Sequence, residues 1–257
     1  MYEERNSRLE EILCGMHSLA IAYSGGIDSS LLLYRAWQVL GNNVAAITVL
    51  TPYMPTSDSK DANDFTDRYG IRHYTVPVKI PKKLHNNPQN RCYICKRMIF
   101  SNLLAKASEL SIETTADGTL FDDSPATRPG MAAAKDMDVS SPLRTAGITK
   151  TMVRTLARQE GIPLWNKPTN SCYLTRFPYG TSITQDKIAM VQNAENLMNS
   201  YGYRDVRVRY RDGTARIELP YEDWKRFASS IHIEQIKESI RSYGFASPYS
   251  VPYQNKH

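Results

Sequence analysis

Apolar and polar positions between residues 19 and 167 recur in blocks typical of strands followed by helices. Short apolar runs of strand length alternate with longer segments of helical spacing. The pattern predicts strands over 19–23, 44–50, 71–76 and 114–118, and helices over 27–40, 57–69, 91–110 and 149–160. Alternation of this kind indicates an α/β fold in which helices cover both faces of a parallel sheet.

The pattern changes after a Pro- and Gly-punctuated stretch over 167–180. It then predicts a helix over 184–200, a hairpin of 206–210 and 215–219, and two helices over 222–229 and 233–242. We therefore expect two domains: residues 1–180 form the α/β domain, and residues 181–257 form a small α+β domain. The last segment, 247–257, is polar, contains two prolines and is expected to fray.

Composition narrows the class of protein. The 257 residues are 41% hydrophobic and 23% charged, which argues against a disordered, collagen-like or coiled-coil chain. Because the chain lacks a secretory apolar region and a long apolar run, we expect a cytoplasmic protein that does not span a membrane. The net charge of +6 permits a nucleic-acid or phosphorylated partner without requiring one.

A glycine-containing loop follows the first predicted strand and opens the first helix. Its two glycines let the backbone turn tightly and present N–H groups, and the helix N-terminus adds positive charge for a pyrophosphate. Asp28 is able to hold Mg²⁺, whereas the missing lysine disfavours a P-loop of the γ-phosphate-transferring kind. The alternative is an ordinary strand–helix turn. The residues expected to bind the nucleotide are Ser24, Gly25, Gly26, Asp28, Ser29 and Ser30.

This SGG-[IVL]-D-S pattern resembles the PP-loop of the ATP pyrophosphatases. The resemblance implies an adenine nucleotide alpha hydrolase-like fold that uses ATP and Mg²⁺. It also implies an adenylation reaction, in which a substrate oxygen attacks the α-phosphate of ATP and pyrophosphate leaves.

The chain has four cysteines: Cys14, Cys92, Cys95 and Cys172. They are too few for a disulfide scaffold, and the C-x-x-C pair suggests redox or metal chemistry. Three thiolates would leave a metal or cluster with an open position, which suits catalysis, unless His73 or His85 supplies a fourth ligand. The alternative, small unrelated core residues, is the preferred interpretation for Cys14, which lies on a predicted N-terminal helix.

Further motifs recur in a fixed order along the chain. They are N-P-x-x-R-C-Y-x-C-K at 87–96, D-G-T-x-x-D-D at 117–123, R-P-G at 128–130, S-P-L at 141–143, W-x-K-P at 165–168, C-x-x-x-R-x-P-Y-G at 172–180 and A-R-I-E at 215–218. This order resembles the LarE family of ATP-dependent sulfur transferases, which act in making a nickel-pincer nucleotide cofactor. The segment 247–257 departs from the family's usual acidic, Tyr-Arg-containing ending.

The resemblance implies a substrate and a source of sulfur. The substrate would be a pyridinium dicarboxylate mononucleotide, whose carboxylate is adenylated and becomes a thiocarboxylate. Cys172 matches the sulfur-donating cysteine of the family. Members that also carry a C-x-x-C are thought to hold a [4Fe-4S] cluster, so the ligands expected here are Cys92, Cys95 and Cys172. The family also suggests a homo-oligomer.

Two arginines of the predicted hairpin are candidates for binding the nucleotide phosphate. Strand alternation places Arg207 and Arg209 on one face, where two guanidinium groups form a fork that suits a phosphate, and the resemblance supports this role. The alternative is a solvated strand face, in which Arg211 or Arg216 are equally exposed.

Glu195 lies on the apolar stripe of the helix over 184–200. Such a carboxylate is either paired with an arginine from the hairpin or directed into a site, and the resemblance supports a metal or base role. Arg176 is a candidate for stabilising the acyl-adenylate or the Cys172 thiolate. We group Cys172, Arg176 and Glu195 as candidate catalytic residues. Further ligand contacts are expected from Asp122, Asp123 and Arg128, in a loop that follows a strand.

Two other functions remain open at this point. A PP-loop tRNA thiouridine synthase also combines this loop with C-x-x-C, but the chain shows no zinc-ribbon cysteines and no aromatic-rich RNA-binding module. The other is a nucleotide-binding module without catalysis. We expect a small-molecule partner, with nucleic acid disfavoured and the sulfide donor unknown.

Overall fold

The computed structural model describes residues 2–126, 128–167 and 171–253. It divides into two compact units: Met1–Lys79 with Gln89–Asn170, and Ile80–Pro88 with Ser171–His257. The division thus falls between Asn170 and Ser171 rather than near 180, and a short segment from within the first expected domain joins the second unit. Cys172, which we expected in the α/β domain, therefore belongs to unit 2. Pro168 of the W-x-K-P motif and the tail at 254–257 lie outside the described residues.

Unit 1 contains a four-stranded parallel sheet in the order β3-β2-β1-β4. The strands are β1 (Leu19–Ala22), β2 (Val44–Leu50), β3 (Arg72–Pro77) and β4 (Thr114–Ala116). The helices are α1 (Tyr2–Cys14), α2 (Ile27–Leu40), α3 (Thr56–Tyr69), α4 (Arg91–Glu109), α5 (Met131–Asp136), α6 (Pro142–Thr145) and α7 (Lys150–Gln159). The predicted α/β fold is confirmed.

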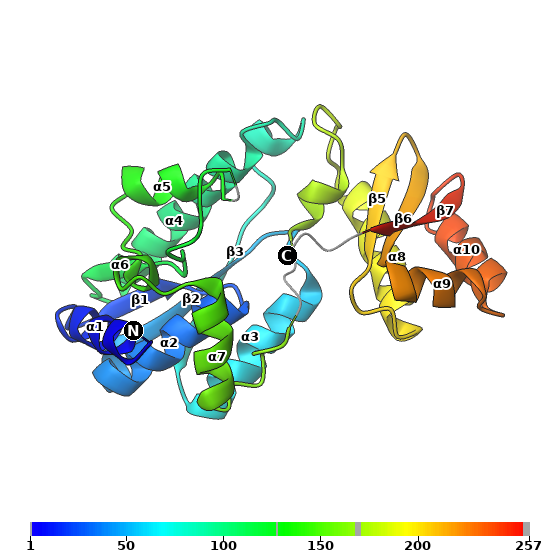
Figure 1. Ribbon diagram of the computed structural model, residues 1–257. Coiled ribbons are helices and arrows are strands. Elements are labelled where there is room, and N and C mark those ends of the chain that lie inside the picture. Colours follow the sequence, from blue (N-terminus) through cyan, green and yellow to red (C-terminus); the bar gives the residue numbers. More distant parts are fainter. Residues whose placement is uncertain (1, 127, 168–170, 254–257) are drawn as a thin grey trace. The chain divides into compact units, whose positions relative to one another are not determined.

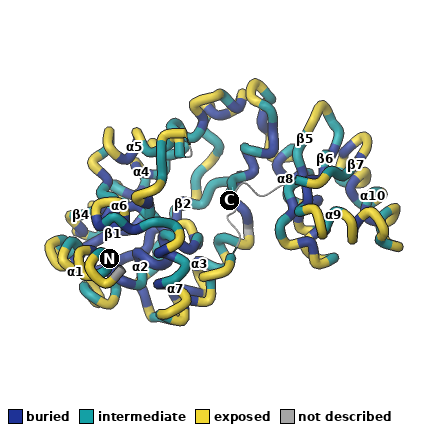
Figure 2. Tube along the Cα trace, viewed as in Figure 1, coloured by how far each residue is buried: buried dark blue, intermediate teal, exposed yellow. Residues whose placement is uncertain are grey.

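Helices cover both faces of this sheet, as the apolar strands require (Figure 1). Leu19 and Ile21 of β1 pack in a core with α1, α2 and α7, whereas Ala20 packs in a second core with α4 and α5. Buried residues are therefore concentrated on β1, β2 and the inner side of α2 (Figure 2). The alternation of side chains along β1 distributes them between the two cores.

Unit 2 is a small α+β unit. Its helices are α8 (Gln185–Ser200), α9 (Tyr221–Ala228) and α10 (Ile233–Ser242), and its strands are β5 (Arg207–Arg211), β6 (Thr214–Pro220) and β7 (Pro248–Tyr253). The predicted hairpin is present: β5 and β6 are antiparallel, and Asp212 and Gly213 at the turn both have positive φ, of 47° and 83°.

The expectation that the tail frays is wrong for 248–253. These residues form β7, which pairs in parallel with β6 at the edge of the sheet. An edge strand tolerates Pro248 and Pro252 because the missing N–H groups can face away from the ladder. Within the described part of the chain, the helices are all too short or too polar to cross a membrane.

Candidate functional site

The glycine loop lies where β1 ends and α2 begins. The strand order reverses at β1, because β2 lies on one side of it and β4 on the other. The carboxyl ends of parallel strands at such a reversal form the usual ligand-binding crevice of an open α/β sheet. A pocket occupies this position; its lining residues are Ala22, Ser24, Gly26, Asp28, Ser29, Lys96, Asp117, Gly118, Thr119 and Arg128.

Two glycines and two serine hydroxyls shape the loop. Gly25 has φ of +71°, and a Cβ there would lie 2.3 Å from the carbonyl oxygen of Asp58 on α3. Gly26 is the N-cap residue of α2 and has no side chain to cover the first helical N–H groups. The Ser24 and Ser29 hydroxyls lie 3.2 Å apart, and the Ser29 hydroxyl donates to the Gly26 carbonyl at 3.0 Å.

Ser30 lies differently from the other predicted loop residues. Its side chain is fully buried, and its hydroxyl lies 3.2 Å from the phenol oxygen of Tyr23. This contact places the Ser30 hydroxyl in the protein interior and away from the pocket lining. Ser30 is part of the loop region only through its position in the first turn of α2.

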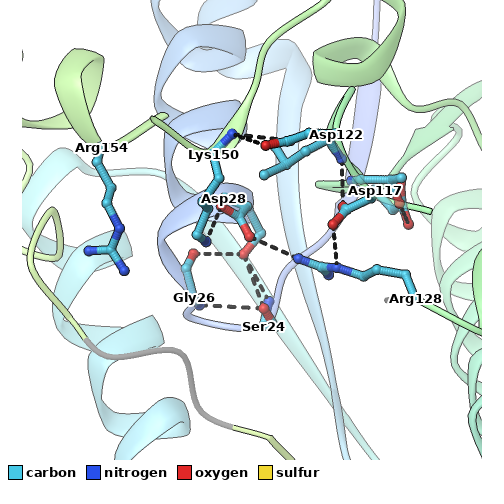
Figure 3. Close-up of polar contacts among 12 residues, drawn as sticks. Ser24, Gly26, Asp28, Asp117, Asp122, Arg128, Lys150 and Arg154 are labelled. Atoms are coloured by element: carbon cyan, nitrogen blue, oxygen red, sulfur yellow. Dashed lines mark hydrogen bonds and ion pairs between the residues drawn. The ribbon is translucent and has the colours of Figure 1, made fainter. Parts of the chain in front are cut away.

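Asp28 lies between two cationic side chains (Figure 3). Lys150 Nζ donates to one carboxylate oxygen at 2.6 Å, and Arg128 Nη2 donates to the other at 3.1 Å. The same arginine pairs with Asp123 through Nε at 3.0 Å, and Asp122 accepts the Lys150 backbone N–H at 3.1 Å. The predicted contact residues of the 122–128 loop thus gather around the loop aspartate. Lys150 was not predicted from the sequence, because it lies 122 positions from Asp28 and belongs to none of the motifs.

The segment after β4 completes the pocket. The Asp117 carboxylate accepts the Thr119 hydroxyl at 2.7 Å and the Ser141 hydroxyl at 2.8 Å, which orders the turn. Gly118 follows, and a Cβ there would lie 2.9 Å from the backbone nitrogen of Ser29. A side chain would therefore push this turn away from the first turn of α2.

The C-x-x-C motif lies in the first turns of α4 within unit 1. Cys92 and Cys95 are three positions apart and so share one side of the helix. The Tyr53 phenol oxygen lies 3.2 Å from Cys95 Sγ, and Lys96, the next residue, lines the pocket beside Asp28. This end of α4 is therefore adjacent to the glycine loop.

The other residues considered as metal ligands, His73 and His85, and the fourth cysteine, Cys14, do not join the C-x-x-C motif. His73 is held between the Thr48 and Thr66 hydroxyls, at 2.8 Å and 3.2 Å from its two ring nitrogens, and burial lowers the pKa of His73. His85 belongs to unit 2. Cys14 is exposed, so the expectation that it is a core residue is wrong. Within 2–126, 128–167 and 171–253, no three His, Cys, Asp or Glu side chains converge as metal ligands.

Cys172 lies directly before a 3₁₀ turn, η3 (Tyr173–Arg176), in unit 2. The Cys172 carbonyl accepts the Thr175 backbone N–H at 3.0 Å and the Thr175 hydroxyl at 2.8 Å. Arg176 donates to the Ser171 hydroxyl at 2.6 Å. The residues on either side of Cys172 are therefore held by one arginine and one threonine.

Glu195 forms a buried ion pair with that arginine. Arg176 Nε lies 2.7 Å from Glu195 Oε1 and Nη2 lies 3.3 Å from Oε2, and the Val208 backbone N–H also donates to Oε1 at 2.8 Å. Burial by itself would lower the pKa of Arg176, but Glu195 outweighs it and raises the pKa. Glu195 is thus paired, although with Arg176 rather than with an arginine of the hairpin. These contacts favour a structural role for both residues, in which the pair positions the turn that follows Cys172.

Replacing Arg176 with methionine should destabilise unit 2 by about 3–5 kcal/mol, because it leaves the Glu195 carboxylate buried without its partner. Equilibrium urea unfolding measures the change. Arg241→Met, which removes an exposed ion pair with Glu238 in the same unit, should leave the midpoint nearly unchanged. A combined Arg176→Met and Glu195→Leu variant should recover part of the loss. A small effect of Arg176→Met alone would contradict a structural pair.

The two hairpin arginines lie on one strand face, as predicted, with the buried Val208 between them. Arg209 Nε pairs with Glu218 at 2.7 Å, and its Nη1 donates to the Thr175 carbonyl at 2.8 Å. Arg207 stacks over the Tyr253 ring at 5.1 Å. Arg209 thus connects the predicted phosphate face with the turn that carries Cys172.

Comparison with known proteins decides the family. The NAD synthase family profile matches residues 5–107. An uncharacterised protein of Synechocystis is 36% identical over 247 residues, covering 95% of this chain and 92% of that protein. The pyridinium-3,5-bisthiocarboxylic acid mononucleotide synthase of Lactiplantibacillus plantarum is 32% identical over 244 residues, covering 94% of this chain and 88% of that enzyme. This chain belongs to the LarE family of PP-loop proteins. The LarE likeness therefore extends over nearly the whole chain, while the NAD synthase match ends at residue 107 and includes the glycine loop.

Proposed function

We propose that this LarE-family protein is an ATP-dependent sulfur transferase. It adenylates a carboxylate of a pyridinium dicarboxylate mononucleotide and converts it to a thiocarboxylate. The observation that carries the proposal is the pocket at the end of β1, where an uncapped helix N-terminus, two glycines and Asp28 meet Arg128 and Lys150. The printed name of the relative from L. plantarum supports the substrate class.

The reaction proceeds in two steps. A carboxylate oxygen of the substrate attacks the α-phosphorus of ATP, and pyrophosphate leaves. Sulfide then attacks the acyl carbon, and the carboxylate oxygen departs with AMP, which leaves a thiocarboxylate. The first N–H groups of α2, of residues 27–29, and the Ser24 and Ser29 hydroxyls would bind the leaving pyrophosphate, because no side chain caps this helix N-terminus.

The donor atoms are of the kinds that the two proposed metal groups bind. The Asp28 carboxylate is an oxygen ligand of the kind that Mg²⁺ takes, and Mg²⁺ bound there would replace Lys150 or Arg128, because these two cations occupy both of its oxygens. Cys92, Cys95 and Cys172 are thiolate ligands of the kind that iron–sulfur clusters require, and a [4Fe-4S] cluster held by three of them would supply sulfide at its open iron. This assignment requires unit 2 to bring Cys172 to α4.

Residues of unit 2 would bind the substrate phosphate and position Cys172. Arg207 and Arg209 would bind the substrate phosphate, and the Arg176–Glu195 pair would hold the Cys172 turn beside them. The proposal also includes a homo-oligomer in the cytoplasm. The alternative function is that of a tRNA thiouridine synthase, and the experiment must distinguish it from the proposed sulfur transfer to a mononucleotide.

Two measurements test the proposal together. Anaerobically purified protein should contain about four irons per chain with matching acid-labile sulfide. Pyrophosphate release from ATP should require the pyridinium dicarboxylate mononucleotide and should not respond to tRNA. Stoichiometric zinc without iron would exclude the cluster, and pyrophosphate release that requires tRNA would favour the alternative enzyme.

A further inference from the structure

The last strand of unit 2 contributes a tyrosine to the sheet face that carries the two hairpin arginines. Tyr253 ends β7, and β6 separates β7 from β5 in the sheet (Figure 1). The Tyr253 side chain crosses β6, because its phenol donates to the Asp205 carbonyl at 2.9 Å. The Arg207 guanidinium lies over the same ring, 5.1 Å from the ring centroid. Tyr253 thus connects the edge strand with the start of β5.

Two contacts fix the orientation of the Tyr253 ring. The backbone of Tyr253 is paired with Pro220 in the parallel ladder between β7 and β6. At the other end of the side chain, the phenol is held by the Asp205 carbonyl. Burial raises the pKa of Tyr253 and Asp205 raises it further, so the phenol stays protonated and able to donate. The ring is therefore held at both ends beneath the arginine.

The arginines of this face differ in how far their charge is already compensated. The buried Glu218 carboxylate lies 2.7 Å from Arg209 Nε and 3.4 Å from Arg216 Nε. Arg207, by contrast, makes no ion pair or hydrogen bond through its guanidinium within the described residues, and its contact is the Tyr253 ring. Its N–H donors therefore remain available for an anion.

We propose that Tyr253 is a positioning residue for the substrate phosphate, because its ring holds the guanidinium of Arg207, the principal phosphate ligand. An aromatic face attracts a guanidinium without using its in-plane N–H donors, whereas a carboxylate partner would compete with phosphate for them. A cation that is oriented before binding loses less conformational freedom when the anion arrives. The inference rests on the proposed function, which supplies the mononucleotide phosphate.

Titration calorimetry of the full chain with the pyridinium dicarboxylate mononucleotide tests this role. Tyr253→Leu should raise the Kd about two- to fivefold, because the cation–π contact is lost, whereas Tyr253→Phe keeps the ring and should stay within about twofold of native. Arg207→Met should raise the Kd about tenfold or more, since it removes charge-assisted hydrogen bonds. Tyr249→Leu is the matched control. Tyr249 lies on the same face of β7, is 44% exposed and pairs in register with Arg216, so its loss should not change the Kd.

A substrate without phosphate separates positioning of Arg207 from support of the fold. The corresponding nucleoside should bind the native protein and Tyr253→Leu equally, because it offers Arg207 no anion. In assays of pyrophosphate release, Tyr253→Leu should raise the KM for the mononucleotide about two- to fivefold and leave kcat at the native value. Equal losses for nucleoside and mononucleotide, or a lower kcat at unchanged KM, would mean that Tyr253 only supports β7 and would overturn the inference.

Inorganic phosphate gives a readout that does not depend on the proposed reaction. The Nε–H resonance of Arg207, assigned by its loss in Arg207→Met, should shift when phosphate is added to the full chain. Tyr253→Leu should need about two to five times more phosphate for the same shift. If the native protein shows this response but releases no pyrophosphate with the mononucleotide, the proposed function fails while the phosphate site holds. An unshifted resonance, or equal phosphate affinity in Tyr253→Leu, would overturn the inference whatever the activity.

Discussion

Cys172→Ala should abolish thiocarboxylate formation, with a loss on the order of 10³-fold or more, because the proposed sulfur donor and cluster ligand is removed. Adenylation should survive. The glycine loop and the cations around Asp28 belong to unit 1, and the turn after Cys172 is held through the Cys172 carbonyl, which alanine retains. The variant should thus release pyrophosphate and AMP without sulfur transfer.

Parallel assays of pyrophosphate and thiocarboxylate measure this separation. Cys14→Ala is the matched control, because Cys14 is an exposed thiol at the end of α1. It should leave both products at native levels. If Cys172→Ala loses pyrophosphate release as completely as sulfur transfer, Cys172 is structural and the proposed division of labour is wrong.

Gly25→Ala should lower ATP-dependent pyrophosphate release by about 100-fold, because a shift of the loop by roughly 1 Å misplaces the reacting groups. The added Cβ would lie 2.3 Å from the Asp58 carbonyl oxygen, so either the loop or α3 must move. Alanine is also disfavoured at φ of +71°. Titration with an ATP analogue should show weaker binding, by the same cause.

Gly70→Ala controls for backbone conformation alone. Gly70 ends α3 with φ of +64°, but a Cβ there meets no atom within 4 Å. This variant should lose about 1 kcal/mol of stability and keep native activity. If Gly25→Ala is as active as Gly70→Ala, the loop does not bind the nucleotide in the way proposed.

Local signals predicted most of the secondary structure. The limits expected for the first helix and the second strand are those of α2 and β2. The helix expected over 184–200 is α8, and Thr184 caps it, since its side-chain oxygen accepts the Lys187 N–H at 3.2 Å. Caps, turns and apolar periodicity act over a few residues and so can be recognised from neighbouring positions.

The sequence did not predict which distant segments pair with one another. The polar tail with its two prolines resembled a frayed end, yet it forms β7 because β6 offers it a free edge. Glu195 was recognised as a residue that needs an arginine, but the partner is Arg176, and the hairpin contributes the Val208 N–H instead. Which partner a buried charge takes depends on packing between elements, which periodicity does not report.

The sequence alone determined the glycine loop between a strand and a helix, the parallel α/β fold, the small second unit and the likeness to the LarE family. These depend on neighbouring residues and on motifs in a fixed order. Only the tertiary structure decided that Arg128 and Lys150 meet at Asp28, that Lys167 is enclosed by Asp58 and Asp61, and that the chain divides before Ser171. These contacts join residues about a hundred positions apart, which become neighbours only when the sheet assembles in the order β3-β2-β1-β4.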